Sequence, residues 1–297
     1  MMRTRRQFLA ALPLAGLPAL SLSAAEEAFR MVTFTKYFQH LSYDALADAM
    51  AEIGLNGIEV AIRPKGHIEP DQVEDELPKL VAALKARNLT LEVMTSGINE
   101  VSQEQRTEAI LRTAATLGIP RYRLSYYKYD LNKPIRAQLD EFRPRLKDLA
   151  ALNQELGIQG VYQNHAGRDY VGASVWDMHD LVRDFDPTAM ALAFDIGHAT
   201  VEGASSWEID FQLCRPNLGI IYVKDYLVNG HKKEGMPLGQ GSVSPKFFPM
   251  VAKLSPRLPI SLHVEYLPEE PASPERTKKH LAALQQDLRT LRALLAA

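Results

Sequence analysis

The chain has 297 residues, with 34 basic and 36 acidic side chains, and its formal net charge at pH 7 is −2. This charge argues against a nucleic-acid-binding protein, which normally carries a basic excess. The single cysteine, Cys214, excludes a disulfide within the chain, so a hydrophobic core must hold the fold together.

The first 25 residues, MMRTRRQFLAALPLAGLPALSLSAA, have a basic start, an apolar run and small residues at the end, as export signals do. The stretch TRRQFL at 4–9 resembles the twin-arginine type. Because the apolar run is shorter than the roughly 20 residues that cross a bilayer, we expect cleavage before Glu26 and no membrane anchor. Cleavage removes three arginines and no acid, which changes the charge from −2 to −5. The predicted product, residues 26–297, is periplasmic or secreted.

Eight short runs rich in Val, Ile, Leu and aromatic residues alternate with helical patterns along the rest of the chain. In the first helical pattern Leu46, Met50 and Ile53 fall on one face, and in the last a stripe of leucines follows Ser273-Pro274, a suitable N-cap and first-turn pair. The predicted strands lie near 31–36, 56–61, 90–95, 121–126, 159–164, 190–195, 219–224 and 259–265.

Four of the predicted helices end at a residue that suits the left-handed conformation: Gly54, Asn88, Gly118 and Gly157. Eight strand-helix units without a Gly-, Ser- or Pro-rich linker predict one domain, a (β/α)₈ TIM barrel over residues 26–297. A doubly wound open sheet is the alternative. No G-x-G-x-x-G follows the first strand, so we expect no nucleotide cofactor.

Almost every predicted strand ends in a polar side chain. Residues two apart in a strand share a face, so Gln163 is expected to point the same way as His165, and His263 the same way as Glu265. Barrel active sites form at the carboxyl ends of the strands, where these side chains would converge. The polar residues at the strand ends are Glu59, Thr95, Ser96, Ser125, Gln163, His165, Asp195, His198, Tyr222, Lys224, His263 and Glu265.

Four short motifs occur in an order that is also found in a known family: FDIGH at 194–198, VKD at 223–225, PLGQGSV at 237–243 and HVEY at 263–266. With them the chain resembles the xylose-isomerase-like TIM barrels, which include sugar isomerases, sugar epimerases and AP endonucleases. The resemblance covers essentially all of residues 26–297. Within the third motif, residues 239–242 lie where barrels often bind phosphate.

The resemblance implies one divalent ion, held by Glu, Asp, His and Glu from the last four strands. Asp195 and Glu265 match this pattern, whereas Gln163 and Tyr222 stand where the family usually has Glu and His. His165, His198 and His263 lie close by as substitute ligands. We therefore leave both a metal-binding and a metal-free site open, and the expected ligands for Mn, Zn or Co are Gln163, Asp195, His198 and Glu265.

For catalysis, removal of a proton next to a carbonyl requires a base and a group that stabilises the resulting oxyanion. Glu265 or Glu59 is the expected base, Lys224 or a metal the expected electrophile, and His165 a further catalytic candidate. Without a metal, we expect the pKa of Glu265 to lie nearer neutrality. His165 could instead only satisfy loop backbone groups, and Lys224 could form a structural ion pair. The expected contacts to substrate are Asn164, Tyr126, Trp207 and Tyr222.

Three functions are consistent with these residues. The first is an exported enzyme that isomerises, epimerises or β-eliminates a keto-sugar or keto-glycoside, with a small carbohydrate as its only partner. The second is a sugar-binding barrel that has lost catalysis along with the family metal site. The third, a phosphodiesterase acting on abasic DNA, fits poorly because strands three and four offer Ser96 and Tyr126 where histidines are needed. No pattern in the sequence indicates an oligomeric state.

Overall fold

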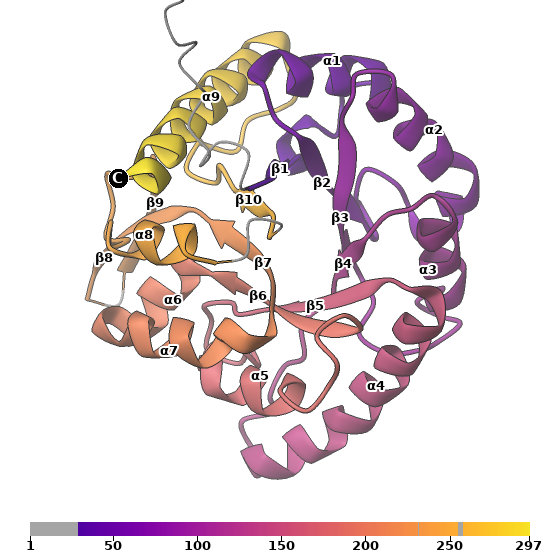
Figure 1. Cartoon of the computed structure of the whole chain (residues 1–297), viewed down its shortest axis with the longest axis vertical. Helices are drawn as coiled ribbons and strands as arrows, with labels where there is room; N and C mark the ends of the chain where they lie inside the picture. The colour runs from indigo at the N-terminus through magenta and orange to yellow at the C-terminus, as the bar shows by residue number, and fades with distance from the viewer. Residues whose placement is uncertain (1–28, 231, 255–257) are drawn as a thin grey trace, which may run out of the picture.

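The computed structural model describes residues 29–230, 232–254 and 258–297. Eight parallel strands close into a barrel in the order β1-β10-β7-β6-β5-β4-β3-β2 (Figure 1). All eight predicted strands are present, so the (β/α)₈ barrel is confirmed and the open sheet is excluded. The strands are β1 Met31–Phe34, β2 Gly57–Ile62, β3 Thr90–Ser96, β4 Arg121–Arg123, β5 Gln159–Gln163, β6 Met190–Asp195, β7 Leu218–Val223 and β10 Ile260–Leu262.

The helices form a ring outside the barrel (Figure 1). Leu46, Met50 and Ile53 are buried on one face of the first helix, as predicted, and four leucines of the last helix are buried likewise. The helices are α1 Tyr43–Ile53, α2 Val73–Lys85, α3 Thr107–Thr116, α4 Ile135–Leu156, α5 Val175–Val182, α6 Ile196–Gly203, α7 Trp207–Cys214, α8 Phe247–Ala252 and α9 Pro274–Ala296, with 3₁₀ turns at Lys36–Phe38, Pro70–Gln72, Ala204–Ser206 and Arg215–Asn217.

The predicted helix ends are confirmed by the backbone. Gly54, Gly118 and Gly157 have φ of 79°, 75° and 66°, in the left-handed region, and Asn88 has φ of 57°. At the start of α9 the hydroxyl of Ser273 accepts a hydrogen bond from the Arg276 N–H at 3.1 Å, which caps the helix. These local signals fix where the helices begin and end relative to the neighbouring strands.

Small and branched side chains fill the inside of the barrel, which has no room for large residues on every strand. They come from alternating positions of β3, β5, β6 and β7, as the two-residue period of a strand requires. One large residue, Tyr222, belongs to this apolar layer. Its members are Val93, Val161, Ala191, Ala193, Ile220 and Tyr222, all fully buried.

An antiparallel hairpin, β8 Asp225–Asn229 with β9 Lys232–Met236, follows β7 and was not predicted. Its first residue, Asp225, accepts hydrogen bonds from the backbone N–H groups of Gly239 (2.9 Å), Gly241 (2.9 Å) and Val243 (3.0 Å). The amides of the PLGQGSV loop are therefore turned toward this carboxylate. Residues 239–242 lie where barrels often bind phosphate, but here the N–H groups of Gly239 and Gly241 bind a protein carboxylate.

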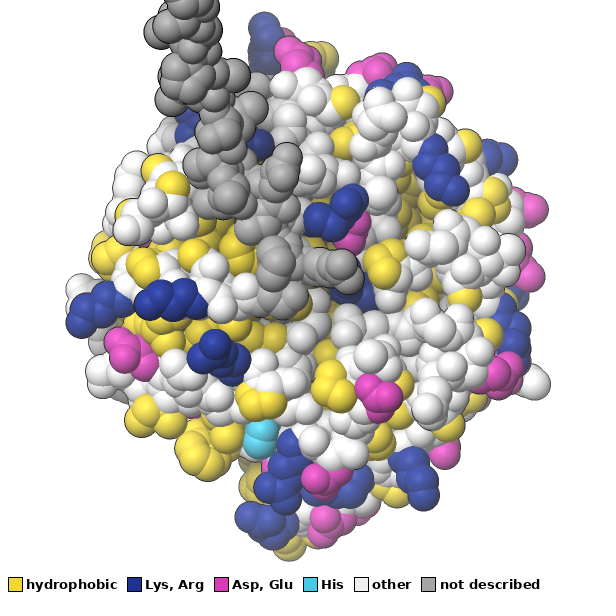
Figure 2. Space-filling view, in the orientation of Figure 1, with side chains coloured by type: hydrophobic (Ala, Val, Ile, Leu, Met, Phe, Trp, Pro, Cys, Tyr) yellow, Lys and Arg dark blue, Asp and Glu magenta, His cyan; other side chains and the backbone are white. Residues whose placement is uncertain are grey.

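Basic and acidic side chains are interspersed over the face shown in Figure 2. No helix within the described ranges is both long and apolar enough to cross a membrane. The predicted export signal, with its twin-arginine motif, lies outside the described residues.

Candidate active site

A cavity of 160 Å³ opens at the carboxyl ends of the barrel strands. Its polar and charged residues lie on β2, β3, β4 and β5 or in the segments that directly follow the barrel strands, where the active sites of TIM barrels form. The predicted convergence is thus present for Glu59, Gln163, Lys224 and Glu265. The lining residues are Phe34, Lys36, Glu59, Arg63, Thr95, Arg123, Tyr126, Gln163, His165, Lys224, His263 and Glu265.

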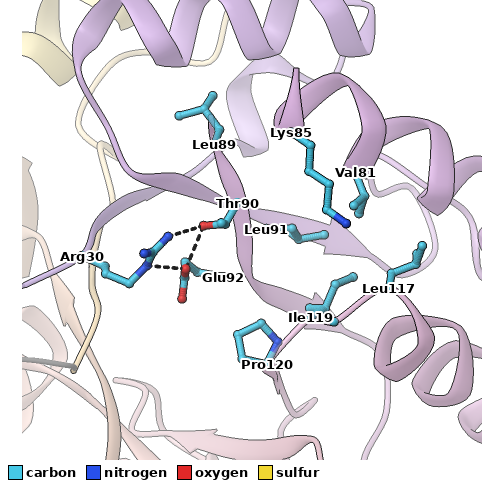
Figure 3. Close-up of a pocket in the computed structure, with 11 residues that line it drawn as sticks. Arg30, Val81, Lys85, Leu89, Thr90, Leu91, Glu92, Leu117, Ile119 and Pro120 are labelled. Atoms are coloured by element: carbon cyan, nitrogen blue, oxygen red, sulfur yellow. Dashed lines mark hydrogen bonds and ion pairs between the residues drawn. The ribbon is translucent and has the colours of Figure 1, made fainter. Parts of the chain in front are cut away.

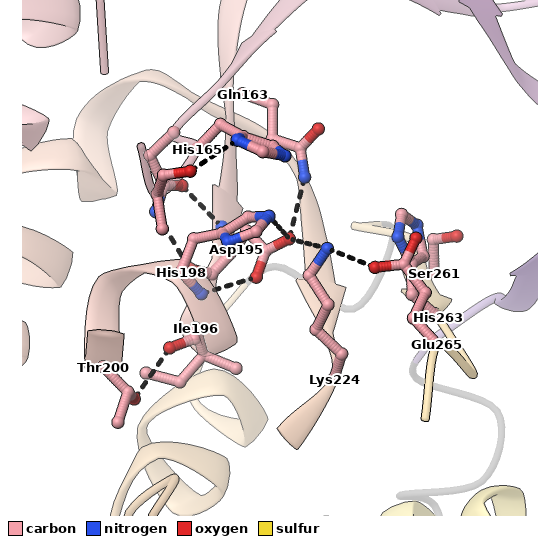
Figure 4. Close-up of polar contacts among 12 residues, drawn as sticks. Gln163, His165, Asp195, Ile196, His198, Thr200, Lys224, Ser261, His263 and Glu265 are labelled. Carbon is pink, nitrogen blue, oxygen red and sulfur yellow. Dashed lines mark hydrogen bonds and ion pairs between the residues drawn. The ribbon is translucent and has the colours of Figure 1, made fainter. Parts of the chain in front are cut away.

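Lys224 lies between two carboxylates at the centre of this site (Figure 4). Its Nζ is 3.2 Å from Oδ2 of Asp195 and 3.1 Å from Oε2 of Glu265, and its side chain is only 5% exposed. Burial lowers the pKa of Lys224, but Asp195 and Glu265 outweigh this and raise it well above its usual value. The lysine therefore carries a fixed positive charge. It is therefore not the surface ion pair that the sequence left open.

Glu265 has a low pKa, contrary to the expectation for a metal-free site. Burial raises the pKa of this carboxyl, but the neighbouring Lys224 and His263 outweigh it and lower the pKa to about 2. The sequence could not show this, because the position of the lysine between the two acids depends on strands 41 residues apart. At neutral pH Glu265 is an ionised carboxylate, and a quarter of its side chain is exposed.

Gln163 uses both ends of its amide to hold this arrangement. Nε2 donates to Oδ2 of Asp195 at 2.7 Å, while Oε1 accepts from the Tyr126 hydroxyl at 2.6 Å and from Nη1 of Arg123 at 3.1 Å. Asn164 also holds Asp195 in place, because its side chain donates to the Asp195 carbonyl and accepts from the Asp195 backbone N–H. Asn164 therefore orients Asp195 and does not line the cavity.

Glu59 lies at the floor of the cavity and is fully buried. It accepts hydrogen bonds from Ser261 (2.7 Å), from Nε2 of His263 (3.0 Å) and from Thr95. Burial raises its pKa, but His263 and these hydrogen bonds lower it overall. Because a carboxylate only accepts, Nε2 of His263 carries the hydrogen. With its oxygens occupied in this way, Glu59 orients His263 and is a poor candidate for the base.

Aromatic rings form one wall of the site. The ring of His165 packs at a tilt against Tyr126 (centroids 4.8 Å apart) and His198 (4.0 Å). Nδ1 of His165 donates to the carbonyl of Ala166 at 2.9 Å, which leaves the Nε2 lone pair free. Burial and then Lys224 lower the pKa of His165 to about 4, so this ring is neutral at pH 7.

The family model for the xylose isomerase-like TIM barrel matches residues 47–293. The chain belongs to this family. A stretch of 117 residues, 39% of this chain and 39% of the relative, is also 26% identical to the Uncharacterized protein MJ1311 of Methanocaldococcus jannaschii.

Solved structures share the fold of this xylose isomerase-like barrel. D-psicose 3-epimerase from Clostridium cellulolyticum superposes with a TM-score of 0.68 at 14% identity, over 90% of this chain and 99% of the epimerase. 3-keto-D-glucoside 4-epimerase from E. coli gives 0.65 at 14% identity, over 89% and 99%. The probable 3-DHS dehydratase from Bacillus anthracis gives 0.67 at 15% identity, over 88% and 99%. At this level of identity the likeness establishes the fold.

The residues of this xylose isomerase-like barrel do not fit the expected divalent-metal site. Lys224 places its ammonium between Asp195 and Glu265, where an ion bound by both would sit, and Gln163 points an N–H at Asp195. His198 is bound to Asp195 through its backbone N–H at 3.0 Å, and its Nε2 is 3.7 Å from the carboxylate. Within the described ranges, no group of three or more His, Cys, Asp or Glu side chains is placed to hold a metal.

Besides Asn164, two more of the expected substrate contacts lie away from the cavity. Trp207 begins α7 with only 6% of its surface exposed and packs edge-on against Phe247, with ring centroids 5.8 Å apart. Tyr222 is fully buried in the apolar layer, and its ring packs at a tilt against His263 with centroids 4.7 Å apart. Both predictions are wrong for the same reason: burial of a large aromatic side chain in the core is favourable, and the position of the residue in the sequence does not show that it is buried there.

Sequence reasoning missed two arginines that line the cavity, Arg63 and Arg123. Arg123 ends β4 and falls within the strand predicted near 121–126. The available signal was alternation, because Arg121, Arg123 and Ser125 share a face, and a charged residue at each of the first two positions is unusual for a core strand.

A larger cavity of 330 Å³ lies at the opposite, amino-terminal end of β3 and β4 (Figure 3). It is lined mainly by apolar side chains, and its Glu92 is bound by Arg30 at 2.5 Å and by Arg121 at 3.1 Å. This end of a TIM barrel serves stability, so size does not make this cavity the active site.

Proposed function

We propose that this protein is an exported carbohydrate-active enzyme that removes a proton next to the carbonyl of a keto-sugar or keto-glycoside. The observation that carries the proposal is the buried Lys224 ammonium, 3.1 Å from the ionised Glu265 at the cavity wall. A fixed cation beside an ionised carboxylate supplies the two groups that enolisation needs, an oxyanion stabiliser and a proton acceptor.

In the proposed step the substrate carbonyl oxygen lies against Lys224, and a carboxylate oxygen of Glu265 takes the hydrogen of the adjacent carbon as a proton. The C–H bond breaks, its electron pair forms the C=C bond of an enediolate, and the carbonyl oxygen gains the negative charge that Lys224 stabilises. Return of the proton from Glu265 to the former carbonyl carbon, with loss of the adjacent hydroxyl proton to the oxyanion, gives isomerisation. Delivery of a proton by water to the opposite face of the original carbon gives epimerisation, and Glu265 then releases its proton to solvent. Expulsion of a substituent on the next carbon gives β-elimination.

The structural relatives support this class of reaction. A D-psicose 3-epimerase and a 3-keto-D-glucoside 4-epimerase have the same barrel. The export signal predicted in residues 1–25 favours free sugars or glycosides as substrates in the periplasm or outside the cell, because sugar phosphates are cytoplasmic.

Solvent hydrogen exchange tests the proposal directly. The full chain is incubated in D₂O with a panel of keto-sugars and 3-keto-glycosides, and deuterium at the carbon next to the carbonyl is measured by NMR. Lys224→Ala and Glu265→Gln should each abolish exchange, whereas Lys279→Ala, which removes an exposed lysine paired with Glu270, should not. Exchange that survives both active-site substitutions rules out the assigned roles.

A non-catalytic sugar-binding barrel is the second candidate, and Gln163 favours it. In this site a neutral amide stands where the family usually has a ligand carboxylate, and both of its ends are already hydrogen-bonded. Saturable binding of a sugar by calorimetry, with no deuterium incorporated and no product formed, would select this function over the enzyme.

A further inference from the structure

Positive charge exceeds negative charge around the candidate site. Four cationic side chains face three carboxylates there, counting Asp195 beneath Lys224. Each of these carboxylates already has a partner: Asp195 and Glu265 bind Lys224, and Glu59 binds His263. Among the Lys, Arg, Asp and Glu side chains, one positive charge therefore remains without a counterion. The four cations are Lys36, Arg63, Arg123 and Lys224.

Arg123 is 4% exposed, and its hydrogen bonds go only to neutral acceptors. Nη1 donates to Oε1 of Gln163 at 3.1 Å and Nε donates to the Thr95 hydroxyl at 3.3 Å. A buried guanidinium normally pairs directly with a carboxylate, because desolvating an unpaired charge is costly. Among the described residues no carboxylate forms an ion pair with Arg123, although Thr95 links it to Glu59.

Arg63 lies next to Arg123 at the mouth of the same cavity. Burial, followed by repulsion from Arg123, lowers the pKa of Arg63. Within the part of the chain that the structure describes, its side chain forms no ion pair or hydrogen bond. Two neighbouring guanidinium groups that face a cavity and lack a protein anion form a receptor for a planar anion. Arg63 presents a fork of N–H donors that matches a carboxylate, and Arg123 adds its Nη2, which donates to no acceptor among the described residues.

We propose that Arg63 and Arg123 bind a carboxylate of the substrate, so that the sugar on which this site acts is a sugar acid. This inference rests on the proposed function and narrows its substrate class. The cavity volume of 160 Å³ suits a single ring, since larger drug-sized ligands occupy about 300 Å³ or more. Lys36 adds a further positive charge at the rim.

Matched pairs of sugars test the proposal by isothermal titration calorimetry on the full chain: D-glucose with D-glucuronate, and D-galactose with D-galacturonate. Each acid should bind about tenfold or more tightly than its neutral partner, as expected for a charge-assisted hydrogen-bonded pair. Arg63→Gln should reduce this ratio to near one, and Arg63→Lys, which keeps the charge but loses the fork, should leave an intermediate ratio.

Arg168→Gln is the control, because Arg168 lines a neighbouring groove and not this cavity. It should retain the full preference for the acids. Melting curves verify that the variants fold. D-glucose 6-phosphate and acetate test whether the site recognises a sugar carboxylate in particular. Tight binding of the sugar phosphate without binding of the uronates overturns the proposal. Binding of acetate with the same affinity as the uronates also overturns it.

Equal binding of acids and neutral sugars, failure of every uronate to bind, or a preference that persists in Arg63→Gln also overturns the proposal. The deuterium-exchange assay runs in parallel on the same panel. If the acids bind through Arg63 but no deuterium exchange occurs, the anion site stands and the catalytic function is refuted. If only neutral sugars exchange deuterium, the catalytic function stands and the anion site is refuted.

Discussion

Lys224→Met should destabilise the protein far more than the loss of an ordinary ion pair. The substitution leaves the buried Asp195 and the largely buried Glu265 facing each other without a cation, and breaking a buried pair in this way costs about 3–5 kcal/mol. A similar magnitude follows from Glu265, whose pKa falls from its ordinary value of 4.5 to about 2. That difference corresponds to about 3 kcal/mol of interaction between the carboxylate and its surroundings.

The sign of the pH dependence follows from the lowered pKa. Ionised Glu265 contributes its stabilisation in full above about pH 4.5 and loses it as the pH falls toward about 2. The deficit of Lys224→Met relative to the unsubstituted protein should therefore be largest at neutral pH. It should shrink in acid, where a protonated Glu265 no longer needs the lysine.

Urea unfolding followed by circular dichroism, at neutral pH and at about pH 3.5, measures this deficit. Lys279→Met is the matched control, because Lys279 also pairs with a glutamate, at 3.3 Å, but the two side chains are 60% and 42% exposed. Its loss should be at most about 1 kcal/mol. Equal losses in the two variants, or a loss for Lys224→Met that does not change with pH, would refute the view that Lys224 is a buried counterion.

Three further outcomes are expected. EDTA should change neither the melting temperature nor any turnover, because Lys224 occupies the place between the two carboxylates. A lower melting temperature or lost turnover that recovers on adding Mn²⁺ or Zn²⁺ would contradict this. Burial raises the pKa of Asp287 from 3.8 to about 6, so the cost of ionising it develops as the pH rises through that range. Asp287→Asn should accordingly stabilise the protein by about 1–3 kcal/mol at about pH 8 and by much less at about pH 4. Unfolding curves of the variant and the unsubstituted protein that coincide at both pH values would refute this. Gly241→Ala should speed proteolysis of the 237–243 loop, because the added Cβ would lie 2.3 Å from Oδ1 of Asp225. Gly97→Ala, whose nearest neighbour is 3.7 Å away, is its control and should be cleaved like the unsubstituted protein.

The sequence by itself determined the barrel, because its signals are local. The two-residue period of each strand, the leucine stripe of α9 and the left-handed caps at Gly54, Gly118 and Gly157 depend only on neighbours along the chain. The same alternation placed polar side chains at the strand ends, and Glu59, Gln163, Lys224 and Glu265 meet there.

Only the tertiary structure decided which of these side chains touch. Pairings between strands depend on how far one strand is shifted against the next, and the register slips beside Glu59 and beside Ala193, two residues before Asp195. Such shifts leave no mark on a local pattern, so the ammonium of Lys224 between two carboxylates and the half-buried guanidinium of Arg63 at the cavity could not be foreseen. Burial of Trp207 is of the same kind, because a helix shows which residues share its face but not what packs against them.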